Sequence, residues 1–248
     1  GLDQIGTLWG CSAYLNEKDH RKVIDTHLEF IKAGSKMITT SNFTIRKRRL
    51  AQNKLENRLK GFLEISGKLA QEAVNISNKD IEIAGSLPTR GETYKSDVFL
   101  SDDELLKEFY ESASIINPYV DLFYLDVLCS SKEIETALES IISFNKDAIV
   151  GVHLKDSGLL PSGETITDLK DILSKYKIEK KIKKIVQCNC SICIRRNAKM
   201  IMIPKENFLL LEGSENLSLY QFNTDIAKHF FCKKCGIYTH HNRKSDPN

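Results

Sequence analysis

Helical segments alternate with short apolar runs over the first 170 residues, and this alternation constrains the fold more than any other feature. Helical spacing predicts helices over 17–33, 46–76, 131–144 and from about 165, and a capping box at Ser101–Glu104 opens another. The apolar runs predict strands at 37–40, 81–84, 120–125 and 148–152, with the second strand ending at Gly85-Ser-Leu-Pro88. This order predicts a parallel sheet covered by helices, with its chemistry at the carboxyl ends of the strands.

Cysteines gather near the end of the chain. Five of the seven lie in the runs Cys188-Asn-Cys-Ser-Ile-Cys193 and Cys232-Lys-Lys-Cys235, and the second run is followed by Gly236. Closely spaced thiolates are the ligands that zinc prefers, and a glycine allows the backbone to turn around the metal. The alternative is buried or disulfide-bonded cysteine, but disulfides need an oxidising compartment and nothing else indicates secretion. The pattern predicts these zinc ligands: Cys188, Cys190, Cys193, Cys232 and Cys235.

Composition narrows the classes of function. The chain has 248 residues, 41% of them apolar, and a net charge of +3. This charge is too small to predict binding to nucleic acid or to a membrane surface. No apolar run is long enough to span a bilayer, and the first residues do not resemble a signal peptide. We therefore expect a cytoplasmic protein without nucleic-acid or membrane partners; the missing initiator Met is consistent with a chain that begins inside a longer gene product.

The last 65 residues differ in character from the rest. Short strand-like runs at 199–203, 208–211 and 217–222 are separated by turn residues. They predict a small antiparallel β module in which bound zinc supplies folding energy. The lysine-rich segment 175–184 marks the joint, so the expected domains are 1–180, a partial α/β barrel, and 181–248, a zinc-binding β module.

The first part resembles the homocysteine S-methyltransferase family. The similar residues are Leu8-Trp9, the His27–Gly34 segment, Ile38-Thr-Thr-Ser-Asn-Phe43, the Gly85–Pro88 loop and the Gly-rich segment 158–165. The resemblance covers about residues 1–173. It implies a barrel of the TIM type, methyl transfer to the thiol of homocysteine, and a zinc ion that activates this thiol. Four of the eight barrel strands are present, so the fold class expected is a partial (β/α) barrel followed by a small, mainly-β zinc module.

The same resemblance implies where the substrate binds. Asp126 directly follows the predicted strand 120–125, which corresponds to the fourth barrel strand of the family. At this position the family usually has a Glu that binds the substrate amine, and Asn42 is the other expected contact. The alternative for both residues is capping of the strand end. The cysteine motifs that hold the family's zinc do not occur in this part of the chain, and the methyl donor stays open.

The last part resembles the glutathione-dependent formaldehyde-activating family, which includes centromere protein V. The similar residues are Cys188–Arg196, Tyr220-Gln-Phe222 and the segment 229–241. The resemblance implies a zinc site at the cysteine triplet with one open position, and a structural site that contains the second pair. The upstream cysteines of that structural site are absent. The pair therefore joins the triplet in one four-sulfur site, recruits His240 or His241, or stays metal-free.

These observations predict a homocysteine S-methyltransferase-like protein with an appended zinc module, impaired because the barrel lacks zinc ligands. The alternatives are a zinc-dependent carbon–sulfur lyase and a non-catalytic zinc-binding protein. The expected partner is a small thiol, either homocysteine or a glutathione adduct, and the open sheet edges predict self-association. Three further interpretations concern single features. The basic run Arg46–Arg49 is a solvated face or an anion site, His27 is a core residue, and Cys11 and Cys129 are small buried hydrophobes.

Overall fold

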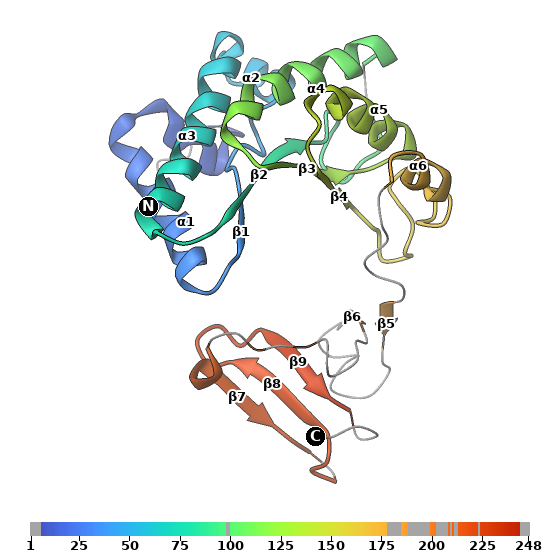
Figure 1. Cartoon of the computed structure of the whole chain (residues 1–248). Coiled ribbons are helices and arrows are strands. Elements are labelled where there is room, and N and C mark those ends of the chain that lie inside the picture. The colour runs from blue at the N-terminus through green and yellow to red at the C-terminus, as the bar shows by residue number, and fades with distance from the viewer. Residues whose placement is uncertain are drawn as a thin grey trace. The chain divides into compact units, whose positions relative to one another are not determined.

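The computed structural model describes residues 6–97, 100–177, 185–187, 199–201, 208, 210, 213–222 and 224–243. The chain divides into two compact units, Gly1–Lys181 and Ile182–Asn248 (Figure 1). The expected zinc ligands Cys188, Cys190 and Cys193 lie outside the described residues.

The first unit is an α/β fold built on one parallel sheet. Its strands are β1 (Met37–Thr39), β2 (Glu82–Pro88), β3 (Leu122–Leu128) and β4 (Ala148–Val152), hydrogen-bonded in that order. The α-helices are α1 (Glu17–Lys32), α2 (Lys47–Gln52), α3 (Leu59–Ser77), α4 (Asp102–Ile116), α5 (Ser131–Ile141) and α6 (Lys170–Lys175). Short 3-10 turns flank them at Trp9–Leu15, Glu56–Arg58, Asn117–Tyr119 and Ile142–Phe144. The predicted parallel sheet with covering helices is confirmed.

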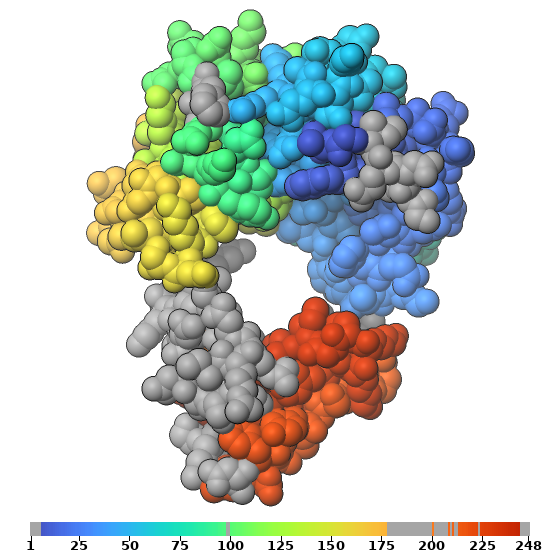
Figure 2. All heavy atoms as spheres, turned by 180° about the vertical axis from the view of Figure 1, so that it is seen from behind, coloured from blue at the N-terminus to red at the C-terminus, as the bar shows by residue number. Residues whose placement is uncertain are grey.

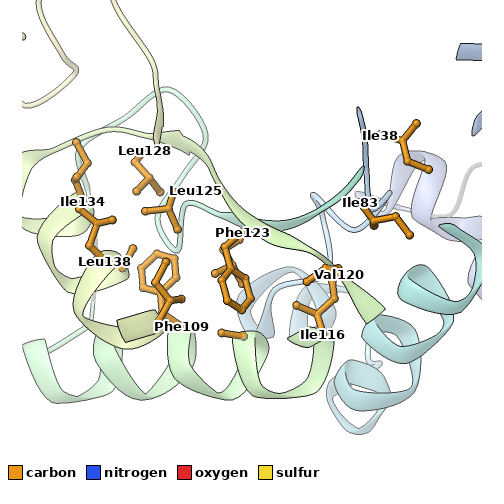
Figure 3. Packing of buried hydrophobic residues seen from close by; sticks show 14 of the residues in the cluster. Ile38, Ile83, Phe109, Ile116, Val120, Phe123, Leu125, Leu128, Ile134 and Leu138 are labelled. Carbon is orange, nitrogen blue, oxygen red and sulfur yellow. The ribbon is translucent and has the colours of Figure 1, made fainter. Parts of the chain in front are cut away.

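Alternate residues of the strands form the main core. Phe123 and Leu125 of β3 and Ile83 of β2 belong to one buried cluster with side chains of α4 and α5 such as Phe109 and Ile134 (Figure 3). Because strand side chains alternate between the two faces of a sheet, the residues between them, including Ser86, Tyr124 and Asp126, point to the face opposite these helices. Burial of the apolar face against α4 and α5 therefore fixes which strand residues can reach a ligand.

A second core joins the N-terminal segments to α3. Leu8, Tyr14, Ile24, Phe62 and Leu63 are all buried in this cluster. In the space-filling view, the blue atoms of the N-terminal segments lie directly against the atoms of the segment that follows β1 (Figure 2). This packing holds the chain that enters β1.

Two local predictions were wrong. The single helix expected over 46–76 is broken between α2 and α3, where Lys54 has a left-handed φ of 57°; a regular helix cannot pass through this conformation. The segment Gly85–Pro88, expected as a loop, is the second half of β2 and pairs with β3. By contrast, the capping box at Ser101 and Glu104 is present at the start of α4.

The second unit is a small antiparallel module, as predicted. Strands β7 (Leu217–Tyr220), β8 (Lys228–Cys232) and β9 (Tyr238–Asn242) form a three-stranded sheet, and β5 (Ile185–Gln187) pairs with β6 (Lys199–Ile201). Phe208 and Leu210, part of an expected strand, are not in a strand. The sequence reading did not assign β8 and β9, whose His- and Phe-rich sequences lack a clear polar–apolar alternation.

Two glycines of α3 provide a matched test of the packing. A Cβ atom at Gly67 would lie 2.5 Å from Cβ of Tyr119, whereas a Cβ at Gly61 meets nothing within 4 Å. We expect Gly67→Ala to lower the free energy of unfolding by about 1–3 kcal/mol through overpacking. Gly61→Ala should raise it by roughly 0.5–1 kcal/mol, because alanine favours the helix. Urea denaturation of both variants would check this pair, and equal effects would contradict the close packing at Gly67.

Candidate functional site

Polar side chains from three adjacent strands form a hydrogen-bonded network near the carboxyl edge of the sheet. The hydroxyl of Thr40, just after β1, donates to Oδ1 of Asn42 over 2.6 Å and accepts from the backbone N–H of Ser86 over 2.9 Å. Nδ2 of Asn42 donates to the carbonyl of Ser86 over 2.9 Å. The Ser86 hydroxyl in turn donates to Oδ2 of Asp126 over 3.0 Å. The network therefore links the two expected substrate contacts, Asn42 and Asp126, through Thr40 and Ser86, which the sequence interpretation had not singled out.

Asn42 lies inside this network. Its side chain is 1% exposed, and both ends of its amide are engaged by Thr40 and Ser86. An amide held in this way orients its neighbours and satisfies their buried polar groups. A direct substrate contact by Asn42 stays a prediction.

Asp126 is the acidic group of the network, and it is half-buried. Burial raises its pKa above the ordinary value, whereas hydrogen bonds from Ser86 and Tyr124 and the charge of Arg46 lower it by less. Loss of hydration is thus only partly compensated by these donors and by the nearby cation. A bound cation, such as an ammonium group, would supply the missing stabilisation.

The backbone is irregular directly after Asp126. The register of β3 with β4 shifts between Leu125 and Leu128, and Val127 has a φ of 59°. A positive φ is rare for a β-branched residue and costs on the order of 1–3 kcal/mol. Such irregularities re-aim side chains at sheet edges, and here the affected segment is the one that presents Asp126.

Arg46 is buried, so the interpretation of the basic run Arg46–Arg49 as a solvated face is wrong for this residue. It is 2% exposed, and its guanidinium donates to the carbonyls of Thr89 (2.7 Å) and Gly91 (3.0 Å) and to the Thr93 hydroxyl (3.3 Å). Burial lowers its pKa to about 10. The loop after β2 needs donors for its carbonyl groups, and Arg46 provides them. The sequence of the basic run does not show which of its side chains is buried. Arg48 of the same run is exposed, as expected.

Glu133 is a buried carboxyl group that the sequence analysis did not identify. Its Oε1 accepts from the Thr89 hydroxyl (2.8 Å) and from the Arg90 backbone N–H (2.7 Å), and its Oε2 accepts from the Cys129 N–H (3.2 Å). Its own backbone N–H donates to Ser130, the N-cap of α5. The Ser-x-x-Glu spacing of a capping box was the available signal. The side chain joins the start of α5 to the loop after β2.

The remaining residues expected in the core are buried. His27 lies in α1, and burial lowers its pKa. Cys11 and Cys129 are buried too; burial raises the pKa of Cys11, and burial with the nearby Glu133 raises the pKa of Cys129 to about 11. Neither thiol has the lowered pKa that marks a reactive or metal-binding cysteine.

Cys232 and Cys235 lie at the end of β8 and in the turn that follows. The Cys232 N–H donates to the Ile237 carbonyl, its carbonyl accepts from the Gly236 N–H, and Gly236 has a φ of 73°. Hydrogen bonds from the backbone N–H groups of Cys235 and Lys234 lower the pKa of Cys232. This turn fits half of a zinc-binding knuckle. Within the part of the chain that the structure describes, no three His, Cys, Asp or Glu side chains are placed to hold a metal. A contribution of His240 or His241 to the site stays a prediction.

Comparison with known proteins agrees with this architecture. The model of the family "Homocysteine S-methyltransferase" matches residues 2–210. The chain belongs to the homocysteine S-methyltransferase family. The model of the family "Glutathione-dependent formaldehyde-activating enzyme" matches residues 173–248, so the two matches overlap over 173–210. Both resemblances found in the sequence are confirmed.

Solved structures of this family share the fold. The homocysteine methyltransferase MmuM from Escherichia coli, in its metallated form, superposes with a TM-score of 0.63 at 20% identity, over 71% of this chain and 66% of MmuM. The oxidized form gives a TM-score of 0.63 at 20% identity, over 72% of this chain and 65% of that one. The match thus spans just under two thirds of the length of MmuM, and at this identity the likeness shows the fold.

Removal of the Glu133 carboxyl group should destabilise the first unit. In Glu133→Ala the Thr89 hydroxyl and the N–H groups of Arg90 and Cys129 lose their acceptor inside the protein. We expect the free energy of unfolding to fall by about 3 kcal/mol. Glu139→Ala, on the exposed face of the same helix, should change it by less than about 0.5 kcal/mol. Thermal and urea unfolding would measure both, and a Glu133 variant as stable as the Glu139 variant would refute the bridging role.

Proposed function

We propose that the first unit binds homocysteine at the carboxyl edge of its sheet and that its reaction class is methyl transfer to the homocysteine thiol, in an impaired form. The Asp126 carboxylate carries this proposal. It is held at the end of β3 by Ser86, and burial leaves it short of compensating positive charge. The ammonium group of an amino acid is a ligand of the right sign, and a charge-assisted hydrogen bond would hold it.

The thiol of the substrate must lose its proton before methyl transfer, and the two cysteines of the first unit are poorly suited to hold a zinc ion that would promote this. These cysteines, Cys11 and Cys129, are buried with raised pKa values. Thiolate ligands for zinc are therefore not provided by these two residues. This supports the impairment, because methyl transfer to a thiol proceeds through the thiolate.

Zinc, where present, would be held by the second unit. The Cys232–Cys235 turn has the glycine and the N–H donors of a zinc knuckle, and we propose that sulfurs of the triplet Cys188, Cys190 and Cys193 complete a four-coordinate site with it. A bound zinc ion supplies Lewis acidity and lowers the pKa of a coordinated thiol. Cys232 contributes a sulfur whose negative charge is already stabilised by backbone N–H groups.

A second candidate function is a carbon–sulfur lyase reaction on a glutathione adduct. The family match over 173–248 and the cysteine triplet favour it. It requires that the triplet keeps one coordination position open for the substrate. If Cys232 and Cys235 complete a four-sulfur site with the triplet, the module is a non-catalytic staple instead.

The cellular setting and the assembly remain predictions. In the described ranges, no helix is both long and apolar enough to cross a membrane. We keep the cytoplasm as the expected location. β1 and β4 are the edge strands of the four-stranded sheet, and the expectation of self-association depends on these edges.

Asp126→Asn should weaken homocysteine binding about tenfold or more, because an ammonium loses its charged partner. The pKa of Asp126 is raised, so wild-type affinity should fall as the pH drops through that raised value and the carboxyl group takes up a proton. The variant should lack this pH dependence. Isothermal titration calorimetry with homocysteine between pH 4 and pH 8 measures both effects.

Asp25→Asn is the matched control, since Asp25 is an exposed carboxylate of α1 paired with Arg21 at 2.8 Å. It should bind homocysteine like the wild type. An Asp126→Asn variant with unchanged affinity would contradict the proposed site. A wild-type rate of methyl transfer to homocysteine as high as that of MmuM would contradict the impairment.

Cys232→Ala should release zinc from the chain. The knuckle then loses a ligand, and with three or four sulfurs around one ion a single loss lowers affinity strongly. Elemental analysis after dialysis should find at least a severalfold lower zinc content than in the wild type. Cys129→Ala, which removes a buried cysteine of the first unit, should keep the zinc. Equal zinc in both variants, or none in the wild type, would refute the assignment.

A further inference from the structure

Gly151 of β4 lies beneath the ring of Tyr124. A Cβ atom added at Gly151 would lie 2.7 Å from both Cε2 and the hydroxyl oxygen of Tyr124, and 2.9 Å from the carbonyl oxygen of Leu125. The φ of Gly151 is not in the left-handed region. The backbone conformation therefore does not itself require glycine; the Tyr124 ring and the Leu125 carbonyl together leave no room for a side chain at this position.

This arrangement brings a second hydroxyl to Asp126. Tyr124 and Asp126 are two residues apart on β3, so their side chains share the face opposite the core. The Tyr124 hydroxyl acts on the Asp126 carboxyl group and lowers its pKa, as does the hydroxyl of Ser86 of β2, which donates to Oδ2 over 3.0 Å. The carboxyl group is thus flanked by one hydroxyl from its own strand and one from a neighbouring strand.

We propose that Tyr124 is a positioning residue that holds the Asp126 carboxylate ready for the substrate ammonium, and that Gly151 provides the room for its ring. The proposal rests on the proposed function for the identity of the ligand, and it deepens that function by naming two residues that shape the site. Neither residue stood out in the sequence.

The need for such a support follows from the local backbone. The register shift after Leu125 and the positive φ of Val127 break the regular ladder directly beside Asp126. The terminal torsion of an aspartate is broad, so the backbone alone does not fix its oxygens. Two hydroxyl donors restrict that torsion, and a carboxylate restricted in the free protein loses less entropy when the ligand binds.

One charged group also acts on Asp126 from the segment after β1. The backbone N–H of Thr89 donates to the Asp126 carbonyl over 3.1 Å, and the Thr89 carbonyl accepts from Arg46. Arg46, Ser86 and Tyr124 are the groups that lower the pKa of Asp126 against the effect of burial. Tyr124 can lose its hydroxyl donor with little change in shape, because phenylalanine keeps the ring.

The test compares Tyr124→Phe with the wild type in the full chain. NMR titration of the Asp126 carboxyl carbon without ligand should show a higher pKa in the variant, since a donor that favours the carboxylate is gone. Calorimetry should show homocysteine affinity reduced about three- to tenfold, the loss of one oriented hydrogen bond. Tyr110→Phe, on the half-exposed Tyr110 of α4, is the control and should leave both values unchanged.

Gly151→Ala tests the space below the ring. The added methyl group should push the ring away and raise the pKa of Asp126 in the same direction as Tyr124→Phe. Gly61→Ala, where the added Cβ meets nothing, should have no effect on that pKa. The effect of Gly151→Ala should shrink in a Tyr124→Ala background, because the two changes act on one contact.

The outcomes separate this proposal from the function on which it rests. If Tyr124→Phe folds and leaves the pKa of Asp126 unchanged, the positioning role is overturned, even if homocysteine binds more weakly. If the pKa rises in the variant while wild-type protein binds no homocysteine, the positioning role stands and the proposed ligand is wrong. If Gly151→Ala fails to fold, the isosteric Tyr124→Phe variant still decides.

Discussion

Polar groups buried at the carboxyl edge of a parallel sheet must find partners inside the protein, and this requirement shapes the first unit. Thr40, Asn42 and Ser86 satisfy one another across β1 and β2, and their network ends on Asp126. Behind them Glu133 and Arg46 supply acceptors and donors for the loop after β2. Within this network Asp126 is the acidic group, and its neighbours compensate its charge incompletely, which makes it the candidate partner for a cationic ligand.

The outline of the fold was predictable because apolar periodicity is a local signal. Four strands and the helices around them follow from it, and β4 has the predicted bounds of 148–152. The predicted ends of strands and helices were wrong where contacts or backbone conformations that periodicity does not report determine the structure. Gly85–Pro88 reads as a loop, yet pairing with β3 keeps it extended. The break at Lys54 depends on a left-handed residue that helical spacing does not reveal.

Only those residues of the candidate site that family resemblance or a position at a strand end indicates could be predicted from the sequence. These two signals point to Asn42 and Asp126, but neither shows that the Asn42 amide is fully engaged within the protein. The inward turn of Arg46 depends on carbonyl groups more than 40 residues away along the chain. Tyr124 and Gly151 form a pair across neighbouring strands, and a single sequence does not specify that contact.

The two units differ in how they stabilise charge on sulfur. In the first unit burial raises the pKa of Cys11 and Cys129, so their sulfurs favour the neutral form. In the second unit backbone N–H groups lower the pKa of Cys232 and so favour the thiolate. A soft metal ion binds thiolates, so a stabilised thiolate favours its binding. The ammonium group of an amino acid binds a carboxylate whose charge is incompletely compensated. Each environment follows from its own local backbone, since the Cys232 turn depends on Gly236 and the Asp126 edge depends on the β2–β3 pairing. In the function that we propose, the recognition of an amino acid and the activation of a sulfur therefore depend on separate local environments, and either can be retained when the other is lost.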